Sequence, residues 1–288
     1  MWGCFLFEFC FYCDMIYVIK WGSIMILYLT STIGGYQKVN DEAVYTKMNN
    51  DNYFVDNLKS ELKSIKDINF SFFCSSPDNF AKTDMYSSAV RKSFELDGFT
   101  FNKFNVIDYR FNQNIEDVVN DSDIVFLCGG HVSTQNTFFD DIALKDILSR
   151  YNGIVIGQSA GSMNSASTVY DQPVTVEELH DANFKKQYPG LGLTNISIMP
   201  HINVAKEEML EGMTTYDMCI LDSKTIPHYG LVDYAYIKVK DGVAETFGRT
   251  TLFKGGSEYL ICNDGESRII NDTYDFGLYS LEVLYRGE

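Results

Sequence analysis

Basic residues are scarce in this sequence and nowhere form a run. Its 288 residues include 23 Lys and Arg against 39 Asp and Glu, which gives a formal net charge of −16. Because phosphate binding needs clustered Lys and Arg, this balance argues against a nucleic-acid partner. An acidic surface of this kind keeps a cytoplasmic protein soluble, and we expect the chain in that compartment.

The sequence also lacks the cysteine pattern of a disulfide-stabilised protein. Seven cysteines form an odd and scattered set, which favours a reducing compartment. Cys10 and Cys13 have no second pair to complete a zinc site. Cys74 and Cys128 end apolar runs, where a cysteine usually acts as a small core residue. Neither GxGxxG nor GxxxxGK followed by Ser or Thr occurs, so a phosphate-binding loop is not expected.

A membrane-spanning run is missing from the apolar first 24 residues. Glu8, Asp14 and Lys20 interrupt that run, and neither a basic start nor a small-residue cleavage site suggests a signal peptide. A membrane-associated leader is an alternative, although we regard a membrane partner as the weaker hypothesis. Met25 begins MILYLTSTIGG, which is typical of a first strand. We therefore expect residues 1–24 to be an extension outside the fold and residues 25–288 to form a single domain.

Apolar runs that alternate with amphipathic segments follow from Met25, and the 45% hydrophobic content is ample for a sizeable core. The predicted strands are 25–29, 69–74, 100–106, 124–128 and 153–156. The predicted helices between them are 53–65, 85–96, 113–120 and 137–150. Strands separated by helices of this length predict an α/β fold, with a parallel sheet covered by helices on both faces.

The segment beyond Ser159 has a different pattern. A strand is predicted at 195–199 and a helix at 205–218. Residues 235–247 (AYIKVKDGVAETF) place Asp-Gly between two alternating runs, which is a strong signal for an antiparallel hairpin. The fold is thus expected to end in an antiparallel portion.

Residues 153–164 (GIVIGQSAGSMN) raise the question of a catalytic serine. A short apolar strand ends at Ser159, glycines stand two residues on either side, and a helix can follow. Strand, sharp turn and helix with serine at the apex form a nucleophile elbow, which would place the hydroxyl above the sheet. An ordinary turn built from small residues is the alternative.

A second strand end carries CGGHVSTQN at residues 128–136. In an open α/β sheet, the functional groups gather at the carboxyl ends of the strands. The N–H groups of Gly129 or Gly130, together with that of Ala160, could form an oxyanion hole. The alternative is a turn whose glycines only relieve steric crowding.

A serine nucleophile needs a base, and the chain has four histidines. His201 directly follows NISIMP, so it is expected at the carboxyl end of a strand. Asp233, just before a predicted strand, is a candidate to orient it, with Asp171 as the rival carboxylate. The order Ser159, His201, Asp233 differs from the Ser, acid, His order of α/β-hydrolases. Asp171 with His228 would satisfy that order, so this reading stays open.

These motifs resemble the dipeptidase E family of serine peptidases, which includes the cyanophycinases and has a class I glutamine amidotransferase-like fold. The resemblance runs from about residue 25 to about residue 260. It rests on the motifs MILYLTS, LCGGH, IGQSAGSMN and IMPHIN in that order, with GLVDYAYI as a weaker fifth match. It implies a site without metal or cofactor.

Carried over residue by residue, the resemblance implies Ser159 as nucleophile, His201 as general base and Asp233 as the third member. Gly130 and Ala160 match the oxyanion-hole positions. The family's glycine turn commonly reads GGGN, whereas His131 stands in the asparagine position here. Between Ser159 and Asp233 the chain also has no arginine, so a preference for N-terminal aspartate is in doubt.

The expected function is that of a cytoplasmic serine peptidase that hydrolyses short peptides through an acyl-enzyme. Two other hypotheses are an esterase or amidase with the same triad and a catalytically silent binding protein. A homodimer is left open.

Overall fold

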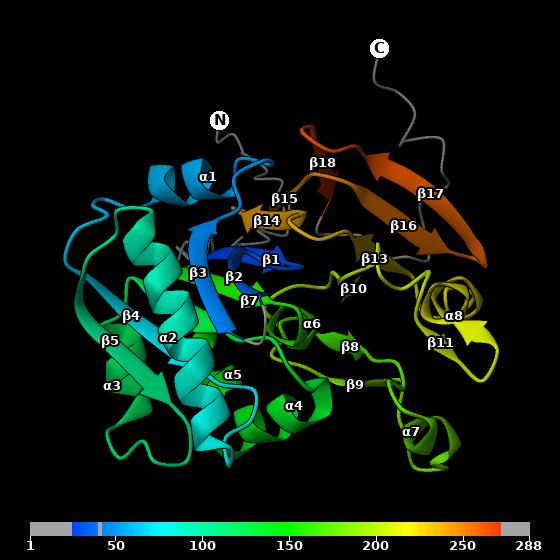
Figure 1. Cartoon of the computed structure of the whole chain (residues 1–288), viewed down its shortest axis with the longest axis horizontal. Helices are drawn as coiled ribbons and strands as arrows, with labels where there is room; N and C mark the ends of the chain where they lie inside the picture. Colours follow the sequence, from blue (N-terminus) through cyan, green and yellow to red (C-terminus); the bar gives the residue numbers. More distant parts are fainter. Residues whose placement is uncertain (1–24, 40–41, 272–288) are drawn as a thin grey trace, which may run out of the picture.

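The computed structural model describes residues 25–39 and 42–271. Its centre is an eight-stranded sheet (Figure 1). In spatial order the strands are β18 (Ser267–Asn271), β15 (Val243–Phe247), β14 (Tyr236–Lys240), β1 (Ile26–Thr30), β7 (Ile154–Gln158), β6 (Ile124–Leu127), β4 (Ile68–Phe73) and β5 (Phe101–Ile107). The run from β1 to β5 is parallel, whereas β14, β15 and β18 add to it in antiparallel pairs.

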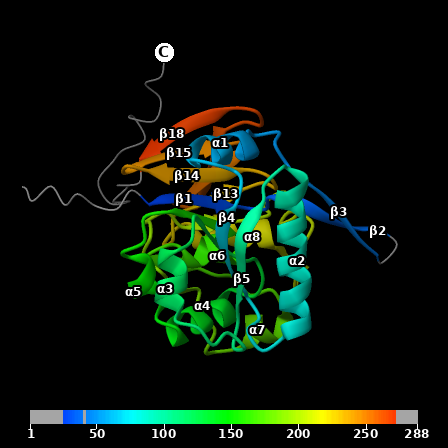
Figure 2. The ribbon, with the colours of Figure 1, turned by 90° about the vertical axis from the view of Figure 1, so that its left-hand side faces the viewer.

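Helices cover the parallel half of this sheet. They are α1 (Phe54–Glu61), α2 (Phe80–Leu96), α3 (Ile115–Asn120), α4 (Val132–Asp141), α5 (Leu144–Leu148) and α6 (Ala160–Asn164). Figure 2 shows α2 and α3 on opposite sides of β5. Strands covered on both faces are apolar throughout, and all four residues of β6 are accordingly buried. The predicted α/β fold with a largely parallel central sheet is confirmed.

A second, four-stranded sheet follows the elbow in sequence. It consists of β10 (Ile198–Met199), β13 (His228–Leu231), β16 (Thr250–Lys254) and β17 (Ser257–Cys262). Three two-stranded pairs complete the strands: β2 (Gly34–Val39) with β3 (Glu42–Met48), β8 (Thr168–Tyr170) with β9 (Gln187–Pro189), and β11 (Met209–Leu210) with β12 (Met213–Thr214). The remaining helices of the described ranges are α7 (Val176–His180) and α8 (Thr215–Asp222).

Several predicted elements differ from the observed ones. The predicted helix 137–150 is two helices, α4 and α5, because Ala143 between them has a φ of 51°. The predicted helix 205–218 is wrong, since the β11–β12 pair turns at Glu211 and Gly212, which both have positive φ. The predicted strand 195–199 is reduced to β10. The β2–β3 hairpin was not predicted.

The Asp-Gly hairpin is confirmed as β14 and β15. Asp241 and Gly242 have φ values of 52° and 75°, as a tight hairpin turn requires at both central positions. Residues 1–24, predicted to be an extension, lie outside the described residues. No helix in the described ranges is long and apolar enough to cross a membrane.

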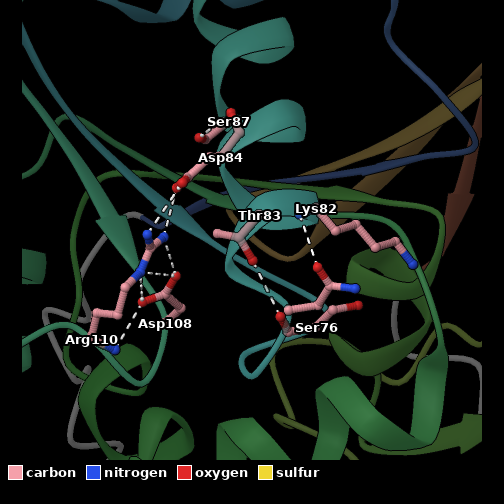
Figure 3. Close-up of polar contacts among 8 residues, drawn as sticks. Ser76, Lys82, Thr83, Asp84, Ser87, Asp108 and Arg110 are labelled. Atoms are coloured by element: carbon pink, nitrogen blue, oxygen red, sulfur yellow. Dashed lines mark hydrogen bonds and ion pairs between the residues drawn. The ribbon is translucent and has the colours of Figure 1, made fainter.

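The carboxyl edge of the parallel strands is fastened to the start of α2 (Figure 3). Arg110, in the turn after β5, binds the buried Asp108 with an Nη2 to Oδ2 distance of 2.6 Å. The same guanidinium reaches Asp84 of α2, also at 2.6 Å. Thr83 Oγ1 donates to the carbonyl of Ser76, which follows β4. These contacts tie the ends of β4 and β5 to the start of α2.

Candidate active site

Ser159 lies at the sharp turn between β7 and α6. Its backbone has φ 50° and ψ −114°, a conformation that side-chain-bearing residues rarely adopt. The Ser159 N–H donates to the Thr30 carbonyl at 2.9 Å, which ties the turn to the end of β1. Ser162 Oγ donates to the same carbonyl. Strand, strained serine and helix together have the form of a nucleophile elbow, as the sequence predicts.

The two glycines around Ser159 are needed for close packing. A Cβ at Gly157 would lie 2.7 Å from Ser162 Cα, and a Cβ at Gly161 would lie 2.1 Å from the Leu127 carbonyl oxygen. Both distances are too short for any side chain. The spacing Gly157-x-Ser159-x-Gly161 therefore allows α6 to turn back tightly against β7 and β6.

The glycine turn after β6 packs directly against the serine. A Cβ at Gly129 would lie 3.2 Å from Ser159 Cβ. Ser75 Oγ donates to the Gly129 carbonyl at 2.7 Å. Because C=O and N–H point in opposite directions across a trans peptide, the Gly130 N–H faces away from Ser75. Within the described residues, neither the Gly130 nor the Ala160 N–H donates a hydrogen bond, so both donors are free for a ligand.

Buried amides join the glycine turn to the helix after the elbow. Gln135 Nε2 donates to the Cys128 carbonyl at 2.6 Å, and Asn164 Nδ2 donates to Gln135 Oε1 at 3.1 Å. Asn136 Nδ2 in turn donates to Asn164 Oδ1 at 3.0 Å. This chain of hydrogen bonds holds α4 and α6 in fixed positions, and sequence reasoning did not find it.

His201 and Asp233 lie next to each other, each in a connection that follows a strand of the second sheet. His201 follows β10 and Pro200, and Asp233 lies in the connection between β13 and β14. His201 Nδ1 lies 2.6 Å from Asp233 Oδ1, within the range expected for an oriented base. The imidazole is 43% exposed, so a substrate can reach it.

Two residues that sequence reasoning missed support this pair. Ser31 Oγ accepts from the His201 N–H at 2.9 Å and donates to Asp233 Oδ1 at 3.2 Å. Asn203 Nδ2 donates to Asp233 Oδ2 at 3.2 Å, and the Asp233 N–H donates to Asn203 Oδ1 at 2.9 Å. The hydrogen bond from His201 is the largest cause of a lowered pKa for Asp233, and the Asn203 and Ser31 bonds add to it against burial. The carboxylate is thus kept ionised.

Ser159 and His201 are anchored to consecutive residues at the end of β1. The Ser159 N–H binds the Thr30 carbonyl, and the His201 N–H binds Ser31 Oγ. Within the described residues, the Ser159 hydroxyl makes no hydrogen bond with the His201 ring. Such a contact often tightens only when substrate is bound.

Asp171, the rival carboxylate, lies elsewhere and makes no hydrogen bond or ion pair with a histidine within the described residues. The sequence favours a place at the far end of the helix that begins at the elbow, but Asp171 directly follows β8 instead. It is buried, with Oδ2 2.6 Å from the Tyr188 hydroxyl. Burial is the main cause of its raised pKa. His228 is also buried, with Nδ1 2.7 Å from the Ile226 carbonyl oxygen. The pairing of Asp171 with His228, in the order of an α/β-hydrolase, is therefore absent.

His131 links the glycine turn to α7. Its Nδ1 lies 2.8 Å from Thr134 Oγ1 in the first turn of α4, and its Nε2 lies 2.8 Å from Glu178 Oε1. Burial favours a higher pKa for Glu178, but hydrogen bonds from the Val174 N–H and His131 hold that pKa below its usual value. His131 is therefore part of the support of the turn. The described residues contain no cluster of three His, Cys, Asp or Glu side chains suited to a metal ion.

Two solved structures of similar fold carry peptidase names. A peptidase from an acI-B1 Actinobacterium matches with a TM-score of 0.60 and 14% identity, over 86% of this chain and 98% of that one. A putative peptidase E protein from Listeria monocytogenes EGD-e matches with a TM-score of 0.53 and 14% identity, over 78% of this chain and 98% of that one. No curated protein sequence matches the chain significantly. The model of peptidase family S51 matches residues 54–247, more than half of the chain, and the chain therefore belongs to that family.

Proposed function

We propose that this protein is a serine peptidase that hydrolyses short peptides, with Ser159 as nucleophile, His201 as base and Asp233 as the orienting acid. The observation that carries the proposal is the 2.6 Å contact between His201 and Asp233, beside a strained serine elbow and a glycine turn. Membership of family S51 supports peptide hydrolysis. A small peptide is the proposed partner.

In the proposed mechanism, Ser159 Oγ attacks the scissile carbonyl carbon while His201 Nε2 takes its proton. Asp233 keeps the other ring proton on Nδ1 and stabilises the imidazolium that forms. The N–H groups of Gly130 and Ala160 stabilise the oxyanion, at about 3 kcal/mol per donor. His201 then gives its proton to the leaving amine. Water, deprotonated by His201, attacks the acyl-enzyme and releases the acid and Ser159.

A dipeptide library tests the proposal, with Ser159→Ala as the control. Removing this hydroxyl should leave the fold intact and lower hydrolysis by about four orders of magnitude or more. Short esters and a fluorophosphonate probe are tested in parallel. Ester cleavage without peptide cleavage would favour an esterase, and a folded protein that neither turns over nor reacts with the probe would favour a silent binding protein.

A further inference from the structure

A cavity of about 600 Å³ adjoins the His201–Asp233 pair on the side of the second sheet. Asp233 and Asn203 form part of its wall, and α8, β16 and β17 each contribute lining residues. Other lining residues come from the connections between elements. Figure 1 shows where α8, β16 and β17 lie in the fold. Neither Ser159 nor Gly130 lines it. The space is large enough for a small organic molecule or a dipeptide.

Two cations on the cavity wall have no anionic partner. Lys206 and Arg249 both line the cavity and are exposed, and neither side chain makes an ion pair or hydrogen bond within the described residues. Lys206 Nζ lies 4.3 Å from the ring centroid of Tyr216, so the ammonium rests against that wall. Arg249 lines the same cavity as Tyr216. Burial and Glu258 raise the pKa of Tyr216, and the charge of Arg249 opposes this rise.

The cavity is also lined by three acidic side chains, two of which already have hydrogen-bond partners. Asp233 already accepts hydrogen bonds from His201 and Asn203, and Glu258 accepts one from the Tyr216 hydroxyl. Asp264 is exposed. Two of the three acids that line the cavity thus already have hydrogen-bond partners, whereas the two cations have none within the described residues. A ligand that carries a carboxylate would give both cations an ion-pair partner, since Arg presents a fork of donors that matches this group.

Part of the wall is apolar, because Ile202, Val232 and Leu260 are among the lining residues. We propose that this cavity is a carboxylate-binding site, in which Lys206 and Arg249 hold the anion and the apolar wall contacts the body of the molecule. The proposal rests on the proposed function only for one source of the carboxylate, the end of a peptide substrate. A free small carboxylate is the other source.

Direct binding to the Ser159→Ala full-length protein tests the site without turnover. The probes are Ala-Ala, its C-terminal amide and N-acetylalanine, each titrated by calorimetry. Ala-Ala and N-acetylalanine both carry a free carboxylate. Adding Lys206→Gln and Arg249→Gln should weaken the binding of whichever of these two acids binds more tightly, by about tenfold or more, as expected when charged hydrogen bonds are lost. Lys185→Gln with Lys224→Gln removes two exposed charges elsewhere and should change nothing. Equal melting temperatures establish that the variants are folded.

The pattern across probes identifies the source of the carboxylate. If Ala-Ala loses affinity and its amide binds weakly throughout, the peptide end is the ligand. If only N-acetylalanine loses affinity, the ligand is a free carboxylate. Unchanged binding of both acids in the double variant, or amide binding as tight as acid binding, overturns the proposal. A protein that hydrolyses no peptide would refute the proposed function but leave this result standing.

Discussion

The His201 ring and the Asp233 carboxylate are joined at 2.6 Å although they come from different connections of the chain. An orienting carboxylate fixes the tautomer of the base and stabilises its charged form. We therefore expect Asp233→Asn to lower kcat by about a hundredfold or more, with little change in binding.

The matched control is Asp171→Asn. Burial already favours the neutral form of Asp171, and its oxygens contact Tyr188 and the Gln172 N–H rather than a histidine. Its effect should therefore fall mainly on substrate affinity. Steady-state kinetics of both variants decide the assignment, and a slower Asp171 variant would transfer the orienting role to that residue.

Ser31 contacts both members of the pair, and we expect it to position them. Its fully buried hydroxyl accepts from the His201 N–H and donates to Asp233. Ser31→Ala should leave the part-buried His201 N–H without its partner. We expect a loss of about 1 kcal/mol in stability and a roughly tenfold lower kcat. Ser31→Thr keeps a hydroxyl and should restore most of the rate. A variant without hydroxyl that matches the wild type in rate and melting temperature would rule this role out.

His131 and Glu178 should act as a unit on the glycine turn, because Nε2 and Oε1 lie 2.8 Å apart. Each single change, His131→Ala or Glu178→Ala, should lower kcat/KM, and the double variant should be little worse than either. We expect a coupling energy of about 1 kcal/mol from this double-mutant cycle. Additive losses would mean that the link between the turn and α7 has no part in the reaction.

The sequence predicts those parts of the molecule that depend on local chemistry. Apolar runs locate the parallel strands, the glycine spacing locates the elbow at Ser159, and Asp241-Gly242 locates the hairpin. Ser31 and Asn203 could not be found in this way, since a common polar residue gains its role only from partners brought near by the fold. Ser31 lies 170 positions from His201. Likewise, the lack of arginine between Ser159 and Asp233 does not predict a cavity without arginine. Arg249 comes from beyond that segment, and the fold brings it to the cavity.

His228 is a buried imidazole that the proposed reaction does not use. It packs between the rings of Tyr170 and Phe253, with centroid distances of 4.2 Å and 5.2 Å. Its Nδ1–H donates to the Ile226 carbonyl, and Nε2 has no partner within the described residues. Burial lowers the pKa of His228 from 6.5 to about 4. The folded protein therefore holds this ring neutral.

This lowered pKa predicts how stability depends on pH. In the unfolded chain, His228 takes up a proton below its ordinary pKa of 6.5, whereas the folded protein resists protonation down to about 4. The free energy of unfolding therefore has its full value above pH 6.5. As the pH falls from 6.5 to about 4, the unfolded chain gains protons that the folded protein does not, and the free energy of unfolding decreases by about 3 kcal/mol in total. His228→Phe keeps an aromatic ring and removes the titrating group, so its unfolding free energy should fall less over the same range. Urea unfolding of both proteins between about pH 7 and pH 4 measures the difference. Parallel pH curves would mean that His228 is protonated as readily in the folded protein as in the unfolded chain.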